Sequence, residues 1–157
     1  MAQPVLMLDL ADETATAALG QRLARACEPG DLIALSGDLG AGKSTLARAL
    51  IRERAGAEID VPSPTFTLVQ TYETPGLAIW HFDLYRLKQA GEARELGLTE
   101  AVDGLALIEW PERLGPHLPQ TRLDVSLDFS PDGRIARLID HHDWSMRIDG
   151  DWRHFNG

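Results

Sequence analysis

The stretch DLIALSGDLGAGKSTL, residues 31–46, decides the fold of this chain. A short apolar run over residues 32–35 leads into Gly37–Ser44, which reads G-x-x-x-x-G-K-[ST], and a helical pattern follows. This is the phosphate-binding loop in its strand–loop–helix setting. Glycines carry no Cβ, so backbone N–H groups can point at phosphate oxygens, and the helix that begins near Lys43 adds the positive end of its dipole. The Lys43 ammonium can reach the β- and γ-phosphates, and the Ser44 hydroxyl can bind Mg²⁺.

The composition indicates one globular domain. The chain has 157 residues, of which 44% are hydrophobic and 25% charged, and its formal charge of -9 argues against a broad basic surface for nucleic acid. Its single cysteine, Cys27, excludes an internal disulfide, and its place on an apolar helix face predicts a core residue. No apolar run is long enough for a membrane span and no signal peptide is recognisable, so we expect a cytoplasmic protein without membrane contact.

Helical and alternating periodicities define the expected elements. Strands are expected over residues 5–10, 32–35, 65–71, 77–82, 105–110, 123–129 and 134–140. Helices are expected from the N-cap Asp12 to residue 27, over residues 43–55 with Gly56 as C-cap, and over 89–96 and 99–103. The order predicts a three-layer α/β fold like that of P-loop NTPases, with a mostly parallel central sheet and antiparallel hairpin additions.

Residues 1–140 are expected to form one P-loop ATPase domain, followed by a tail of uncertain structure over residues 141–157. The tail contains Trp144 and Trp152 without clear periodicity. These rings could anchor the tail or contact a partner, and the sequence does not choose between them.

Two acidic residues stand where a nucleotide site needs them. Asp83 follows the strand over residues 77–82, and Glu109 follows the apolar part of the strand over residues 105–110. Ligands gather at the carboxyl ends of strands in open α/β sheets, and a phosphate loop needs an acid to hold Mg²⁺ or to position water. A carboxylate at a strand end can also simply cap a neighbouring helix, so both interpretations stay open here.

The rest of the chain favours ATP over GTP. The guanine-reading motif N-K-x-D is absent, because the only asparagine is Asn156, and no D-x-x-G switch motif occurs. The arginines after the phosphate loop form no compact cluster of the kind a small-molecule kinase uses in its lid. A small-molecule kinase is thus less favoured than an ATPase, and it stays as the alternative function.

Four motifs in order carry a resemblance to a known family. They are Gly37–Thr45, then SPTFTL at residues 63–68, then HFDLYR at residues 81–86, and then EWPE at residues 109–112. Together they resemble the bacterial TsaE (YjeE) family over roughly residues 10 to 140. That family is the ATPase component of the machinery that makes N6-threonylcarbamoyladenosine (t6A37) in tRNA.

The resemblance implies roles for particular residues. ATP would be bound by Gly40, Ala41, Gly42, Lys43, Ser44, Thr45, Thr65, Thr14 and Arg134. Ser44, where the family usually has threonine, and Glu109 would bind Mg²⁺. Lys43, Asp83 and Glu109 would be the catalytic residues, with Asp83 orienting water or the metal shell. Plain structural roles also suit several of these positions, since Thr65 fits a strand and Arg134 could be a solvated charge, and the nearby His81 could be a structural histidine.

The expected function is ATP hydrolysis coupled to a partner assembly. The resemblance implies that the partners are the TsaD and TsaB proteins, that tRNA is met only through this complex, and that hydrolysis drives or resets the modification cycle. Two other classes remain, namely a small-molecule kinase and a nucleotide-sensing adaptor without turnover.

Overall fold

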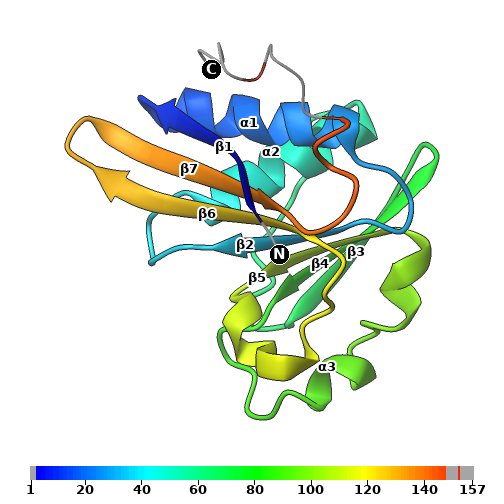
Figure 1. The fold of residues 1–157 in the computed structure, drawn as a ribbon. Coiled ribbons are helices and arrows are strands. Elements are labelled where there is room, and N and C mark those ends of the chain that lie inside the picture. Colours follow the sequence, from blue (N-terminus) through cyan, green and yellow to red (C-terminus); the bar gives the residue numbers. More distant parts are fainter. Residues whose placement is uncertain (1–2, 148–151, 153–157) are drawn as a thin grey trace.

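A single seven-stranded sheet organises the molecule, with the order β1-β7-β6-β2-β5-β4-β3 (Figure 1). The computed structural model describes residues 3–147 and residue 152. The strands in chain order are β1 (Gln3–Leu10), β2 (Leu32–Ser36), β3 (Val69–Thr74), β4 (Leu77–Asp83), β5 (Leu105–Glu109), β6 (Leu123–Ser130) and β7 (Gly133–Asp140).

The four central strands β6, β2, β5 and β4 run parallel to their neighbours. The edges are antiparallel, with β3 paired to β4 on one side and β7 and β1 added beyond β6 on the other. β5 is buried along its whole length and β2 along all but its last residue, as parallel strands covered on both faces require. The predicted mostly parallel centre with antiparallel hairpin additions is confirmed.

Helices cover both faces of the sheet and make the three layers. Two long helices, α1 (Glu13–Ala26) and α2 (Lys43–Ala55), lie together on one face, and α3 (Glu92–Glu95) lies on the other (Figure 1). The short helices η1 (Glu100–Asp103) and η2 (Pro111–His117) join α3 there. Each face has its own hydrophobic cluster, because side chains alternate along β5: Leu107 faces the long helices and Ile108 faces the short ones.

The predicted caps of the two long helices are confirmed. The Asp12 carboxylate accepts a hydrogen bond of 2.9 Å from the Ala15 N–H, which makes Asp12 the N-cap of α1. Gly56 ends α2 in the left-handed conformation at φ 70°. Cys27 lies buried after α1, and burial raises the pKa of its thiol to about 11. A protonated, buried thiol of this kind is the core residue that the sequence predicts.

Three expected elements differ from the structure. Residues 65–67 form a turn rather than the start of a strand, and β3 begins only at Val69. The turn is closed by the Leu68 N–H, which donates to Pro64 O at 2.6 Å, so the β-branched threonines there were a misleading strand signal. The helix expected over residues 89–96 is limited to α3. The strand expected over residues 105–110 ends at Glu109, and η2 begins at Pro111.

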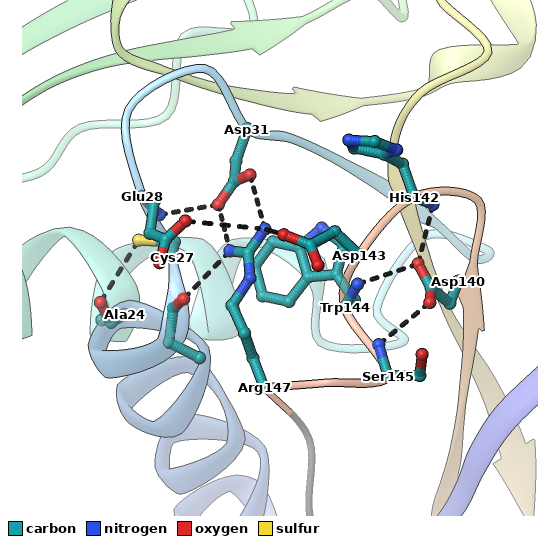
Figure 2. Close-up of polar contacts among 11 residues, drawn as sticks. Ala24, Cys27, Glu28, Asp31, Asp140, His142, Asp143, Trp144, Ser145 and Arg147 are labelled. Carbon is teal, nitrogen blue, oxygen red and sulfur yellow. Dashed lines mark hydrogen bonds and ion pairs between the residues drawn. The ribbon is translucent and has the colours of Figure 1, made fainter.

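The beginning of the C-terminal tail packs on the domain. Trp144 and Trp152 are buried and belong to the cluster under the long helices, so these rings anchor the tail within the chain. Figure 2 shows how the Arg147 guanidinium reaches the Asp31 carboxylate, with N–O distances of 2.6 and 3.1 Å. The hydrogen bonds to Asp31 raise the pKa of Arg147. The Asp140 carboxylate meanwhile accepts hydrogen bonds from three loop N–H groups, those of His142, Trp144 and Ser145.

Across residues 3–147 and 152, no helix has the length and apolar character needed to cross a bilayer.

The close packing of α1 on α2 yields a stability prediction. A Cβ on Gly20 would lie 2.4 Å from Leu46 O, which is backbone of α2 and cannot rotate away. We expect Gly20→Ala to lower the free energy of unfolding by about 2 kcal/mol, since overpacking outweighs the gain in helix propensity. Gly91→Ala is the matched control, because Gly91 has helical backbone angles and open space around it. Urea unfolding of both variants checks this, and equal stabilities would contradict it.

Candidate functional site

The phosphate loop joins β2 to α2 in a conformation that only glycine allows at its key positions. Gly37 and Gly42 have φ values of 145° and 113°. A Cβ on Gly37 would also lie 2.5 Å from Leu127 O, and one on Gly42 would lie 3.2 Å from the Thr16 methyl group. The glycines expected from the sequence are therefore required both by the backbone angles and by the close approach of β6 and α1.

Lys43, the first residue of α2, is a buried cation above this loop. Its side chain donates hydrogen bonds to Gly37 O and to Asp38 O, the latter at 3.4 Å. Its ammonium lies 3.8 Å from the centre of the Trp110 ring, a cation–π contact. Burial lowers the pKa of Lys43, and the nearby carboxylates, first among them Glu109, oppose that shift.

The two strand-end acids lie side by side. Asp83 ends β4 and Glu109 ends β5, and the two residues are direct partners in the parallel ladder. Both are buried, with exposures of 5% and 2%. The sequence predicts both at strand ends, and the register of β4 and β5 makes those ends meet.

Both oxygens of Asp83 accept a hydrogen bond from donors of its own chain. Its Oδ2 accepts from the Thr65 hydroxyl and its Oδ1 from the Tyr85 N–H, each at 3.0 Å. The Thr65 hydroxyl lies 2.7 Å from that of Ser63. The loop over residues 63–68 is therefore tied to the end of β4 through Asp83.

Glu109 has one bound and one open oxygen. Its Oε2 lies 2.7 Å from His81 Nε2, whereas no hydrogen bond joins its Oε1 to any of the described residues. The next residue, Trp110, takes the left-handed conformation at φ 60° and ψ 50° and packs against Tyr85 at 4.9 Å between ring centres. This turn after β5 carries the Trp110 ring over Lys43.

A cavity of about 270 Å³ opens on the other side of the loop, between α1 and β7. It is lined by Ala11, Asp12, Glu13, Thr16, Gly40, Ala41, Gly42, Thr45, Gly133 and Arg134. The Arg134 guanidinium donates to Gly40 O at 3.2 Å, and the Thr45 hydroxyl donates to Glu13 Oε1 at 3.1 Å. These contacts bring the start of β7 and the start of α1 to the phosphate loop.

Most of the predicted site residues converge on the loop. Ser44 is exposed in the first turn of α2, as a hydroxyl that binds a ligand must be. Thr14 is exposed in the first turn of α1 but does not line the cavity, where its neighbours Glu13 and Thr16 do. A larger groove of about 520 Å³ between α1 and α2 shares only Thr45 with the predicted site and contains neither the glycine loop nor a buried acid.

Sequence reasoning missed three contributors. His81 carried a usable signal, because it lies two residues before Asp83 and strand residues two apart share a face. Glu13 and Thr16 carried none, since their place depends on how α1 docks beside α2.

Comparisons with known proteins identify the family of this chain. The family model described as "Threonylcarbamoyl adenosine biosynthesis protein TsaE" matches residues 10–137. Several proteins named tRNA threonylcarbamoyladenosine biosynthesis protein TsaE are similar to this chain. The one from Rickettsia felis is 41% identical, covering 91% of this chain and 85% of its own, and the one from Bacillus subtilis is 37% identical, covering 74% and 73%.

The fold has a solved counterpart. The crystal structure of Bacillus subtilis YdiB superposes with a TM-score of 0.80 at 29% sequence identity, over 99% of both chains. The phosphate loop, the paired strand-end acids and the family match agree, and the chain belongs to the TsaE family.

Proposed function

We propose that this chain is a Mg²⁺-dependent ATPase that acts in the threonylcarbamoyladenosine modification of tRNA, in complex with TsaD and TsaB proteins. The observation that carries the ATPase proposal is Lys43, a buried cation that bonds to the phosphate loop itself and lies near the carboxylates of Asp83 and Glu109. The chain's membership of the TsaE family supports the role in tRNA modification.

Phosphate binding would come mainly from the backbone. The N–H groups of the loop and of the first turn of α2 would bind the phosphate groups, where the helix dipole favours negative charge. Lys43 has three N–H donors, and its bonds to two loop carbonyls can be exchanged for bonds to phosphate oxygens. Arg134 would steady the loop through Gly40. Thr14 stays a predicted nucleotide contact.

The donor set fits Mg²⁺. Ser44 offers an exposed hydroxyl, and Glu109 offers one carboxylate oxygen that no group of the described chain occupies. Oxygen donors of this kind, with the remaining positions filled by water and phosphate, are what Mg²⁺ prefers. When bound, the metal would neutralise charge on the transferred phosphate.

The two acids would then divide the work. Glu109 would serve the metal, whereas Asp83, with both oxygens bonded inside the chain, would hold Thr65 at the site. We propose that the Asp83–Thr65 pair positions the attacking water, so that catalysis is mostly placement and electrostatics.

Exposed apolar side chains near the site support docking of a protein partner. Leu39 in the phosphate loop, Phe66 in the loop tied to Asp83, and Tyr85 beside Trp110 are 69%, 80% and 40% exposed. Apolar and aromatic side chains of this size at a site mouth are typical anchors of protein interfaces. A partner seated there would exclude water from the site, and tRNA would be met only through that partner.

The role of Lys43 is tested by substitution. We expect Lys43→Ala to lower ATP turnover in the presence of TsaB and TsaD by about 100-fold or more, because the charge on the transferred phosphate loses its main side-chain partner. Phosphate release is the measurement, made with the protein alone, with a set of small acceptors, and with both partners. Lys88→Ala is the control, since Lys88 is the chain's only other lysine and is exposed.

Each arm of this assay has a decisive outcome. Turnover that survives Lys43→Ala would refute the mechanism. ADP formation that needs a small acceptor and no partner would instead identify a kinase, and nucleotide binding without any turnover would identify an adaptor.

The division between the acids is a second prediction. We expect Glu109→Gln to raise the Mg²⁺ concentration for half-maximal binding of a fluorescent ATP analogue by about 10-fold or more. Asp83→Asn should leave that concentration near the wild-type value while lowering turnover, because in our proposal the Asp83 carboxylate positions the attacking water and does not bind the metal. Both variants keep side-chain size, so each is the control for the other. The reverse pattern would assign the metal to Asp83.

A further inference from the structure

His81 is a buried histidine that the proposed mechanism does not yet use. It lies on β4 beside Leu107 of β5, and it faces the long helices together with Asp83. Its exposure is 2%, so water cannot replace a lost hydrogen-bond partner of the ring. A polar pair at this depth requires its hydrogen bond.

The contact between the two residues is specific to one atom of each. His81 Nε2 on β4 lies 2.7 Å from Glu109 Oε2 on the neighbouring strand β5. An ionised carboxylate only accepts, so the proton of this hydrogen bond belongs to Nε2. His81 Nδ1 is buried and has no hydrogen-bond partner among the described residues, which agrees with a ring that carries its single proton on Nε2.

From this geometry we propose that His81 is a positioning residue: by donating from Nε2 to Oε2, it orients the Glu109 carboxylate so that Oε1 is presented to the Mg²⁺–nucleotide site. This deepens the proposed function and rests on it. Hydrogen bonds from outside the metal shell commonly orient ligating carboxylates in this way.

The alternative is that His81 merely fills space in the core. Packing alone does not require the ring nitrogen to meet a carboxylate, and the neighbouring positions on the same face of β4, Leu77 and Ile79, are filled by aliphatic side chains. A test must therefore separate the effect of losing the hydrogen bond from the effect of changing the side-chain volume.

Two amide variants make that separation. The side-chain N–H₂ of glutamine in His81→Gln reaches about as far along the side chain as Nε2, whereas the shorter amide in His81→Asn reaches only the position of Nδ1. His81→Leu keeps an apolar volume without any donor. His117→Asn is the control, because His117 is exposed in η2.

The measurement is binding of a fluorescent ATP analogue by the full chain, with Mg²⁺ varied and with EDTA, beside thermal unfolding of each variant. We expect His81→Asn and His81→Leu to raise the Mg²⁺ concentration for half-maximal binding by about 10-fold or more. We expect His81→Gln to bring this concentration most of the way back to the wild-type value. Binding in EDTA should stay unchanged in all of them, because the phosphate loop is intact.

Other outcomes overturn the inference. It fails if His81→Asn and His81→Leu show the wild-type Mg²⁺ dependence, if binding in EDTA falls equally, or if His81→Gln is no better than His81→Leu. It also fails if none of the three variants folds, since His81 would then be structural. Failure of the proposed function looks different, because the wild-type chain itself would bind no nucleotide.

Discussion

The structure depends on one buried cation. Lys43 begins α2 and is only 5% exposed as a residue, with its ammonium bonded to two carbonyls of the phosphate loop and covered by the Trp110 ring. A charge in such surroundings is tolerated only with hydrogen-bonding partners and opposite charge close by. Three features provide this compensation: the loop carbonyls that accept hydrogen bonds from Lys43, the Trp110 ring that covers its ammonium, and the nearby carboxylates. The same surroundings make a phosphate group a fitting partner for the ammonium.

The parallel register of the central strands places those acids. Asp83 and Glu109 are ladder partners at the ends of β4 and β5, yet their surroundings differ. Asp83 has both oxygens bonded by the chain and ties down Thr65, whereas Glu109 keeps one oxygen open and rests the other against His81. Two carboxylates at one edge therefore have distinct chemical capacities, which is the basis for assigning one to the metal and the other to water.

Local signals predicted much of this molecule. Asp12 and Gly56 were recognisable as helix caps, the hairpin of β6 and β7 followed from strict alternation, and the strand ends at Asp83 and Glu109 were recognisable from the apolar runs before them. Signals failed where a tertiary contact overrode propensity. Thr65 has the side chain of a strand residue but bonds to Asp83 from a turn, and Arg147, in the described start of the tail, is held by the distant Asp31.

The sequence by itself determined the phosphate loop, the caps of the two long helices and the identity of the strand-end acids, because each depends on the backbone or chemistry of a few adjacent residues. Only the tertiary structure decided that both oxygens of Asp83 are hydrogen-bonded within the chain while Glu109 keeps a free oxygen. It also decided that His81 is the partner of Glu109 and that Arg134 reaches Gly40 from β7. These contacts join segments that are far apart in the chain. They are set by strand register and by the docking of α1 beside α2, which no local pattern encodes.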